Sequence, residues 1–352
     1  MPRYLLFATT LYALPILRPL EQAIHASGGE AAWFIASSLE DYMWPGEHVL
    51  RNLEQVNAFA PVAVFSASNW VPYFFPGFKV QVFHGFNVEK RAAQRGHFRI
   101  RGLFDLYCTQ GPETTAPFEK LALRHRHFDV IETGWPKLDP LFADDAGRAE
   151  DLRPNDGRAT CMYAATFTEN LSSARTLYTT IAEQVARGDR YWLLTLHPKT
   201  EPALVERYRA LAGPNARYLE AVDFVPMMRA ADVLVSDTSS AVSEFIVQGK
   251  PVVTFRNRAP RPHMIDISEP AELEPALQHA LDSPAELMHE IGTYAQSIHP
   301  YRDGRSSERV LAATAALAAG KAAALAPKPR NLWRKLHGRL RYRRWTIESA
   351  SD

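Results

Sequence analysis

The sequence predicts a two-domain α/β protein in which each domain contains a parallel β-sheet. Three observations favour this fold: the length of the chain, its globular composition, and short apolar runs that alternate with stretches of helical period. The chain has 352 residues, which suits two domains of about 150 residues each. The apolar fraction is 46% and the charged fraction 22%, as expected for a globular protein.

The predicted strands are short apolar runs bounded by turn residues. In the first half they cover residues 4–9, 32–36, 62–66, 80–83, 106–109 and 130–133, with a helix over 12–26. In the second half they cover 160–164, 192–196, 216–219, 233–236 and 252–255, with helices over 172–187, 202–211, 239–248 and 270–281. Strands that alternate with helices form parallel sheets, and ligands bind beyond the carboxyl ends of the strands.

A break in this pattern lies at residues 143–158, which are charged and contain Gly and Pro but no long apolar run. We read this segment as a linker. The sequence therefore predicts a domain over 1–145, a second domain over 146–310, and a C-terminal helix with a basic tail over 311–352.

Charge, cysteine content and hydropathy indicate a cytoplasmic protein. The 40 Lys+Arg and 39 Asp+Glu residues give a formal net charge of +1, so no overall field favours nucleic acid. Cys108 and Cys161 have neither CxxC spacing nor neighbouring ligand residues, which argues against a disulfide framework or a zinc site. We expect no transmembrane helix, because no run of about 18 apolar residues occurs. The apolar N-terminus, broken at Thr9, Thr10 and Pro15, fits a strand and a helix better than a signal peptide.

Two histidines follow predicted strands, one in each half of the chain. His84 follows the run QVF and precedes Gly85, which permits a tight turn, and His197 ends the run WLLTL and precedes Pro198. We expect the two imidazoles to face each other across the cleft between the domains. A lone histidine is more often structural than functional, so each keeps that alternative.

A third group of polar residues follows the strand at 233–236. Asp237, Ser239 and Ser240 form the turn before the next predicted helix, and Glu244 lies one turn inside it. Ser and Asp are ordinary N-cap residues, and capping alone would account for them. The same geometry also forms an anion site, because backbone N–H groups, hydroxyls and the helix dipole converge there.

Six motifs occur in the order found in the CDP-glycerol glycerophosphotransferase family, which the chain resembles from about residue 80 to 310. They are His84-Gly85, TGWPKLDPLF (133–142), YAATF (163–167), LHPK (196–199), SDTSSAVSE (236–244) and YRDGRSSER (301–309). Members of this family help to build teichoic-acid-like polymers of the cell envelope. The resemblance implies a GT-B-like fold, with an N-terminal acceptor domain and a C-terminal nucleotide-donor domain. It also implies metal-independent transfer of glycerol phosphate from CDP-glycerol to a hydroxyl.

The motifs depart from the family pattern at several positions. The family's His-Gly-Thr-Pro-Leu appears as HGFNV (84–88), its Gly-Tyr-Pro-Arg as GWPK (134–137), and its Asp-Tyr-Ser-Ser as DTSS (237–240). The Asp that closes the last motif is Glu244 here, and Lys137 replaces an Arg, which gives up bidentate phosphate recognition but keeps the charge. These changes weaken the case for glycerol as the transferred group more than the case for a nucleotide diphosphate-type donor.

Phosphoryl transfer requires a base for the attacking hydroxyl and positive groups around the developing charge. We assign His84 as the base, and we expect His197 to hold or protonate the transferred phosphate. Lys137, Ser239 and Ser240 are expected to bind the pyrophosphate. The remaining predicted donor-site residues are Gly85, Ala165, Thr166, Pro198, Lys199, Asp237 and Glu244. Neither a metal nor another cofactor is expected, because the sequence has no Asp-x-Asp, P-loop or GxGxxG pattern.

Two other functions remain open at this point. A GT-B glycosyltransferase or sugar-nucleotide epimerase has the same fold, and a non-catalytic nucleotide- or glycan-binding protein would use the same cleft. CDP-ribitol or another CDP-alditol also remains possible as the donor. The sequence fixes neither the acceptor, a glycan or a lipid-linked hydroxyl, nor the number of units added, nor the oligomeric state.

The segment from Arg330 to Trp345 is basic and amphipathic, and it follows a helix expected over 310–325. Its apolar face holds Leu332, Trp333, Leu336 and Leu340. Such a segment suits an anionic membrane surface, which predicts peripheral attachment to the inner face of the cell membrane. A solvated or packed terminal helix is the alternative. Nucleic acid is not expected as a partner, because no basic fold motif accompanies the segment.

Overall fold

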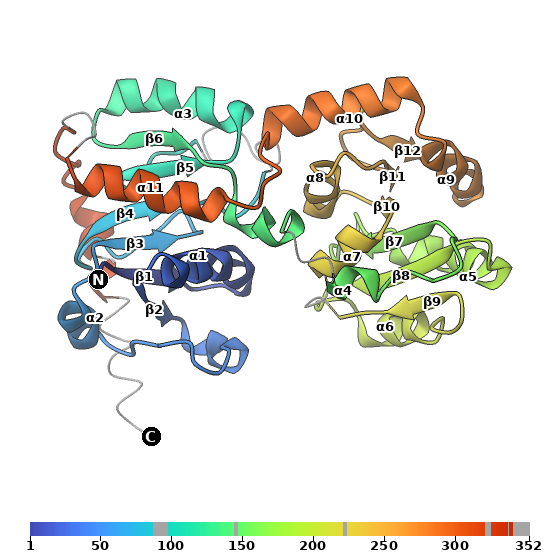
Figure 1. Ribbon diagram of the computed structural model, residues 1–352, viewed down its shortest axis with the longest axis horizontal. Coiled ribbons are helices and arrows are strands. Elements are labelled where there is room, and N and C mark those ends of the chain that lie inside the picture. Colours follow the sequence, from blue (N-terminus) through green and yellow to red (C-terminus); the bar gives the residue numbers. More distant parts are fainter. Residues whose placement is uncertain (87–97, 144–146, 221–223, 321–324, 337, 341–352) are drawn as a thin grey trace. The chain divides into compact units, whose positions relative to one another are not determined.

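The structure, a computed structural model, describes residues 1–352 except 87–97, 144–146, 221–223, 321–324, 337 and 341–352. The chain divides into two compact units (Figure 1). Unit 1 contains Met1–Asp139 and Asp303–Asp352, and unit 2 contains Pro140–Arg302. The chain thus enters unit 2 at Pro140 and returns to unit 1 at Asp303.

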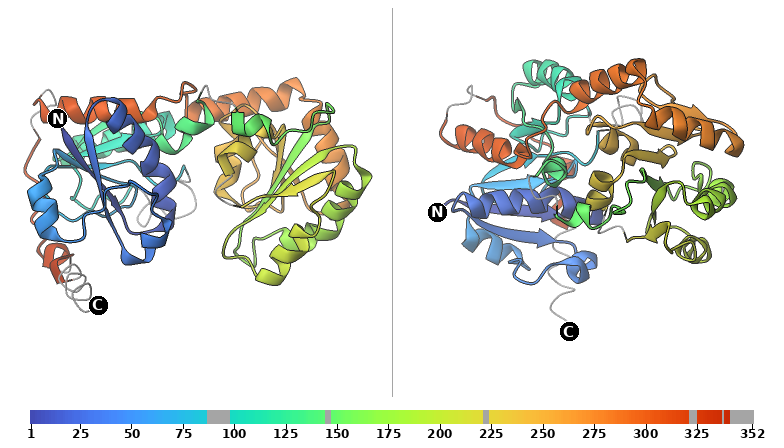
Figure 2. Two further views of the ribbon diagram at one scale, coloured as in Figure 1. Left: turned by 60° about the horizontal axis from the view of Figure 1, so that its bottom comes forward. Right: turned by 45° about the vertical axis from the view of Figure 1, so that its right-hand side comes forward.

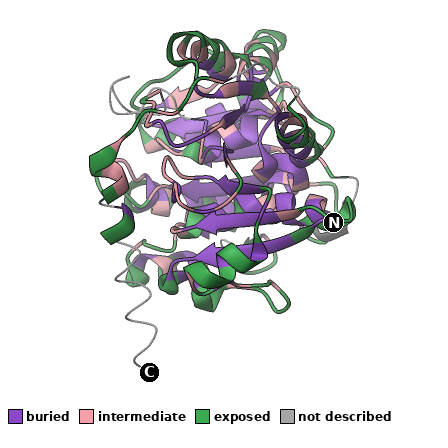
Figure 3. Cartoon of the chain, turned by 90° about the vertical axis from the view of Figure 1, so that its left-hand side faces the viewer, coloured by how far each residue is buried: buried purple, intermediate pink, exposed green. Residues whose placement is uncertain are grey.

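Unit 1 contains a six-stranded sheet in the order β2-β1-β3-β4-β5-β6, in which all pairs are parallel. Its strands are β1 (Arg3–Ala8), β2 (Glu30–Ile35), β3 (Ala63–Ser66), β4 (Phe78–Gln81), β5 (Leu106–Thr109) and β6 (Asp129–Glu132). Most strand residues are buried, as Figure 3 shows for this part of the molecule. Burial on both faces explains why the central strands β1 and β3 are largely apolar, whereas the edge strand β6 has the sequence Asp-Val-Ile-Glu.

Helices cover the sheet of unit 1. They are α1 (Leu14–Ala26), α2 (Leu53–Phe59), α3 (Pro112–His125) and α11 (Ser306–Ala318), with 3₁₀ segments η1 (Leu11–Ala13), η2 (Ser37–Tyr42) and η3 (Pro136–Leu141). The last of these carries the chain into unit 2. Helix α11 packs on α1, β4 and β5, so the segment after Asp303 supplies part of the helical layer of unit 1. Phe118 of α3 packs in the core with Phe83 and Tyr107.

Unit 2 repeats the architecture with a six-stranded parallel sheet in the order β12-β11-β10-β7-β8-β9. Its strands are β7 (Thr160–Ala165), β8 (Tyr191–Leu196), β9 (Ala216–Tyr218), β10 (Val233–Ser236), β11 (Val252–Phe255) and β12 (Ile265–Ile267). Its helices are α4 (Gly147–Glu150), α5 (Ala174–Arg187), α6 (Pro202–Arg209), α7 (Phe224–Ala230), α8 (Ser240–Ile246), α9 (Leu273–Leu281) and α10 (Ala285–Ile298), with η5 (Pro270–Glu272).

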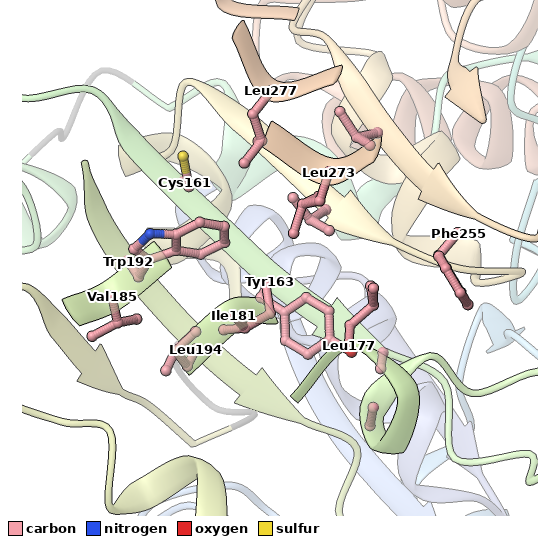
Figure 4. Close-up of a cluster of buried hydrophobic side chains, with 14 of the residues drawn as sticks. Cys161, Tyr163, Leu177, Ile181, Val185, Trp192, Leu194, Phe255, Leu273 and Leu277 are labelled. Atoms are coloured by element: carbon pink, nitrogen blue, oxygen red, sulfur yellow. The ribbon is translucent and has the colours of Figure 1, made fainter. Parts of the chain in front are cut away.

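The core of unit 2 is filled from both the sheet and the helices that cover it. Tyr163 of β7 and Trp192 of β8 are fully buried and pack with Leu177 of α5 and Leu273 and Leu277 of α9 (Figure 4). This packing explains why β8 carries large apolar side chains along most of its length.

The structure confirms the predicted α/β fold with parallel sheets, and it differs from the sequence analysis in detail. Strand β12 was not expected, because its sequence Ile-Asp-Ile is too short to form an apolar run. No bounds were predicted for helix α10, and α4 lies inside the predicted linker. The helix predicted over 310–325 begins at Ser306 and ends at Ala318. In the described part of the chain, no helix has the length and apolar character needed to cross a membrane.

Candidate functional site at the carboxyl ends of the strands

His84 lies just beyond the carboxyl end of β4, after Val82 and Phe83. Phe83 is fully buried and has a φ of 57°, a left-handed conformation that a bulky residue adopts only when its surroundings impose it. Nδ1 of His84 lies 3.3 Å from the carbonyl oxygen of Ala67, and the imidazole lies 5.4 Å from the ring of Tyr12. Because a carbonyl only accepts, Nδ1 carries the proton of the neutral ring, and Nε2 has the lone pair.

Trp135 connects this turn to the segment that carries Lys137. The indole Nε1–H of Trp135 donates to the carbonyl oxygen of Phe83 over 3.3 Å, and its ring lies 5.0 Å from that of Phe86. Nζ of Lys137 lies 5.2 Å from the centre of the same indole ring. The structure thus brings His84, Gly85 and Lys137 to neighbouring places in unit 1. The last residues of the HGFNV motif, Asn87 and Val88, lie outside the described residues.

Asp139 joins two of the motifs through its buried carboxylate. One oxygen accepts from the backbone N–H of Ser306 over 2.8 Å, and the other accepts from that of Ser307 over 2.7 Å. These two residues begin α11, where a carboxylate is also favoured by the helix dipole. Burial raises the pKa of Asp139, and the bonds from Ser307 and Ser306 act in the opposite direction. The 133–142 and 301–309 motifs therefore contact each other because Asp139 binds the start of α11.

His197 lies directly after β8 in unit 2. The backbone N–H of Lys199 donates to Nδ1 of His197 over 3.1 Å. Since Nδ1 accepts, the neutral imidazole carries its proton on Nε2. The imidazole lies 4.3 Å from the ring of Phe167, which follows β7. Burial, followed by the positive charge of Lys199, lowers the pKa of His197 from its usual 6.5, so the ring is neutral at pH 7.

Asp237 is fully buried and holds together the loops that follow β7 and β10. Its carboxylate accepts from the backbone N–H of Thr166 at 3.0 Å and from the N–H and hydroxyl of Ser173 at 2.9 and 3.1 Å. The side-chain amide of Asn257, which lies after β11, donates to the backbone carbonyl of Asp237 over 3.3 Å. Asp237 therefore fixes the shape of the sheet edge, and its predicted contact with a donor stays a prediction.

The two serines after β10 have different environments. Ser239 is the N-cap of α8, and its hydroxyl accepts from the backbone N–H of Ala241 over 3.2 Å. Ser240 is exposed at the first position of the helix. Glu244 is buried in α8, with 3% of its surface exposed. The capping expected from the sequence is present at Ser239, and the phosphate-binding role of both serines stays a prediction.

The predicted residues form two groups, each at the carboxyl edge of its own sheet. Unit 1 holds His84, Gly85 and Lys137. Unit 2 holds the others at the ends of the adjacent strands β10, β7 and β8. Ala165 is the last residue of β7, and the residues after these strands are Thr166, His197, Pro198, Lys199, Asp237, Ser239, Ser240 and Glu244. The expectation that His84 and His197 face each other across a cleft remains a prediction.

The sequence analysis missed Gln110, which follows β5. Its side chain is fully buried, and neither its amide nitrogen nor its amide oxygen has a hydrogen-bond partner among the described residues. Such a group costs about 1–3 kcal/mol when it stays unpaired, so it marks a place where a polar ligand or water would be stabilised. The sequence could have indicated Gln110 as a candidate, because this polar residue directly follows a strand and precedes the helix α3.

Metal-ligating side chains do not gather in the described part of the structure: no group of three or more His, Cys, Asp or Glu residues suited to a metal ion occurs there. Cys108 and Cys161 are both free and buried, each within a strand. Burial raises the pKa of both thiols, so neither is poised as a thiolate nucleophile.

Comparison with solved structures identifies the fold as GT-B-like. A putative UDP-N-acetylglucosamine 2-epimerase from Listeria monocytogenes superposes with a TM-score of 0.64 at 18% identity, covering 91% of this chain and 97% of that one. The wall teichoic acid polymerase TagF superposes with a TM-score of 0.63 at 14% identity, covering 92% and 91%. UDP-GlcNAc 2-epimerase from Neisseria meningitidis, solved with UDP-GlcNAc, gives 0.61 at 13% identity, covering 89% and 99%.

Comparison with curated sequences relates the chain to a teichoic acid glycerol-phosphate primase from Bacillus subtilis (strain 168), which is 25% identical over 156 residues. The match covers 42% of this chain and 39% of the primase, so it spans less than half of either protein. A family model described as UDP-N-acetylglucosamine 2-epimerase matches residues 114–315, which is more than half of the chain. This range includes His197 and Asp237 but not His84. The chain therefore belongs to the UDP-N-acetylglucosamine 2-epimerase family.

Proposed function

We propose that the protein transfers glycerol phosphate, or a related alditol phosphate, from a CDP-activated donor to a hydroxyl of a cell-envelope glycan or lipid-linked acceptor. The observation that carries the proposal is the opposite hydrogen bonding of the two histidines. In the neutral state His84 has its lone pair on Nε2, as a base requires. His197 has its proton on Nε2, as a hydrogen-bond donor to a phosphate oxygen requires.

In the proposed step the acceptor oxygen attacks the phosphorus that carries the alditol. The bond from that phosphorus to the bridging oxygen breaks, and CMP leaves with the electron pair. His84 takes the hydroxyl proton, a contribution of about 10²–10⁴-fold in rate for a positioned base. His197 donates a hydrogen bond from Nε2 and keeps its proton, because its lowered pKa holds the ring neutral.

The positive charge needed around the pyrophosphate is supplied in this proposal by Lys199 in unit 2 and Lys137 in unit 1. The hydroxyl of Ser240 adds a donor, since it is exposed at the start of α8. Such groups replace a metal ion as the source of electrostatic stabilisation. The proposal places the reaction in the cytoplasm, at the inner face of the membrane when the acceptor is lipid-linked.

The relatives support this choice of reaction. One is named as a teichoic acid glycerol-phosphate primase, and a structural neighbour is named as a wall teichoic acid polymerase. Both names belong to cell-envelope polymer synthesis, and both fit a chain whose motifs resemble the CDP-glycerol glycerophosphotransferase family.

Family membership favours a second candidate, an epimerase or GT-B glycosyltransferase that acts on a nucleotide sugar. The matching family model is described by UDP-N-acetylglucosamine 2-epimerase, and one neighbour was solved with UDP-GlcNAc. Both candidates use unit 2 for the nucleotide, so they differ in the group attached to the diphosphate and in the fate of that group.

A donor panel separates the two candidates. The purified full-length protein is incubated with CDP-glycerol, CDP-ribitol or UDP-GlcNAc, with and without a hydroxyl acceptor, and nucleotides and products are identified by chromatography and mass spectrometry. CMP release with an alditol phosphate added to the acceptor is the expected result. UDP release, or a 2-epimer of UDP-GlcNAc, would replace the proposal with the second candidate. Donor binding without turnover of any kind would indicate a non-catalytic binding protein.

A further inference from the structure

The C-terminal segment that follows α11 is bound to unit 1 through one side. Nζ of Lys328 contacts the carboxylate of Asp105 at 2.7 Å and the carbonyl oxygen of Leu103 at 2.9 Å. The side chains of Asn331 and Arg334 donate to the carbonyl oxygen of Arg101, at 2.9 and 3.0 Å. These bonds fix the start of the helical stretch at 332–336 and 338–340, drawn in red near the C-terminal label in the left view of Figure 2.

The helical stretch also packs against the loop that follows β3. Gly338 is buried, and a Cβ at that position would lie 3.3 Å from Cζ2 of Trp70. The charged groups of Lys335 and Arg339 lie 5.0 and 5.7 Å from the ring centre of Tyr73. The charged groups of Lys335 and Arg339 therefore help to attach the helix through cation–π contacts.

The opposite side of the stretch is apolar and open. We define the apolar stripe as the four side chains that are exposed there: Leu332 (71% exposed), Trp333 (85%), Leu336 (52%) and Leu340 (57%). Folding alone does not explain this arrangement, because large apolar side chains are normally buried when a helix can turn them inward. Here the side of the helix that carries Gly338 packs on unit 1, and the four apolar side chains stay exposed.

We propose that the apolar stripe docks on an anionic membrane surface. Charge supports this occupant: from Pro327 to Ile347 the sequence contains no Asp or Glu. Arg330 and Arg339 are exposed near the stripe, and Arg334 and Lys335 are partly exposed. A basic helix with a tryptophan and leucines on its open side inserts that side into the headgroup region, where each Lys or Arg adds about 1 kcal/mol. A second copy of the chain would bring the same positive charges together and is disfavoured.

The helix that carries the apolar stripe is connected to His84 through one loop of unit 1. Trp70, which packs on Gly338, belongs to the same short loop as Ala67, whose carbonyl oxygen accepts from Nδ1 of His84. Within unit 1 the membrane-facing helix and the candidate base thus share one loop, 67–70. The consequence, delivery of a lipid-linked hydroxyl to His84 from the membrane surface, rests on the proposed function, whereas docking itself does not.

The test is sedimentation of full-length protein with phosphatidylcholine vesicles that contain or lack phosphatidylglycerol. Wild type is compared with a Trp333→Ser, Leu336→Ser double variant, with Arg330→Glu, and with the control Leu123→Ser. Leu123 is 80% exposed on α3, away from the tail in sequence. Binding to anionic vesicles is expected to fall at least about tenfold in the double variant, because two inserted side chains are lost. Arg330→Glu is expected to weaken binding mainly at low salt, and Leu123→Ser to leave it unchanged.

Equal binding of wild type and double variant, or equal binding to neutral vesicles, would overturn the proposal. So would a dimer in analytical ultracentrifugation that the double variant loses, since the stripe would then bind a second copy. Turnover with a water-soluble hydroxyl acceptor is measured on the same variants and is expected to stay at the wild-type level. Because vesicle binding is measured without donor, it succeeds or fails independently of the proposed reaction.

Discussion

His84 and His197 each follow a strand, one in each unit, yet their hydrogen bonds run in opposite directions. Nδ1 of His84 faces a carbonyl oxygen, and Nδ1 of His197 receives a backbone N–H. The same side chain is therefore prepared as an acceptor at Nε2 in unit 1 and as a donor at Nε2 in unit 2. The comparison teaches that the backbone group beside Nδ1, and not the position after the strand, decides what each imidazole can do.

The residues that orient the two imidazoles also lie at different distances along the chain. His197 is oriented by Lys199, two residues away, so the residue that orients this imidazole belongs to the same loop. His84 depends on Ala67 and Tyr12, and the turn before it depends on Trp135, which lies 52 residues from Phe83. Changes elsewhere in unit 1 are therefore expected to disturb His84 more readily than changes elsewhere in unit 2 disturb His197.

The largest effect on turnover is expected when either of the two histidines is replaced. We predict that His84→Ala and His197→Ala each lower turnover by at least about 10²-fold, because one removes the base and the other a donor to the phosphate. Steady-state kinetics with saturating donor measures the effect. His279→Ala, on the exposed side of α9, is the control and is expected to keep full activity. Near-wild-type turnover in either variant would make that histidine structural.

A smaller effect separates capping from donor binding at α8. Ser240→Ala is expected to weaken donor affinity by about 1.5–3 kcal/mol, the contribution of a hydrogen bond to a charged group. Ser239→Ala is expected to lower the free energy of unfolding by about 1 kcal/mol, because its hydroxyl already caps the helix. Calorimetric titration and thermal unfolding are measured on both variants. An unchanged donor affinity in Ser240→Ala would remove that residue from the donor site.

A pH experiment examines the donor state of His197. Because its pKa in the folded protein is lower than 6.5, the neutral ring contributes stability above that pH, and the contribution is lost as the pH falls through the folded pKa. We predict that wild type loses more thermal stability between pH 7.5 and pH 5, values that bracket about 6.5, than His197→Gln does. Identical pH profiles of wild type and His197→Gln would show that the pKa of His197 is not lowered by folding.

The smallest expected effect is that of metal removal. We predict that activity survives EDTA, because lysine side chains and N–H donors are assigned to neutralise the pyrophosphate. Turnover is measured before and after chelation, and again after Mg²⁺ or Mn²⁺ is added. A loss in EDTA that added metal restores would contradict the metal-free mechanism.

The sequence predicted the fold well, because the fold depends on local pattern. Apolar runs located the strands at 160–164 and 192–196 to within a residue at each end, and both histidines indeed follow strands. Contacts between distant residues were beyond reach: Asp139 and Ser306 are 167 residues apart, and no local pattern links them. The tautomers of the histidines were equally hidden, since they depend on single backbone groups of the folded chain.

The bonds from Ser306 and Ser307 to Asp139 have a consequence for synthesis on the ribosome. Unit 2 is a continuous insertion whose last strand ends at Ile267, so its sheet can close while the remainder of unit 1 is still being made. Unit 1 has its strands early, yet it lacks the layer that α11 adds beside α1. A chain that ends before Ser306 therefore contains every residue of unit 2, whereas Asp139 of unit 1 still lacks both of its backbone donors. Unit 1, which is synthesised first, therefore needs the residues after Asp303 before its fold is complete.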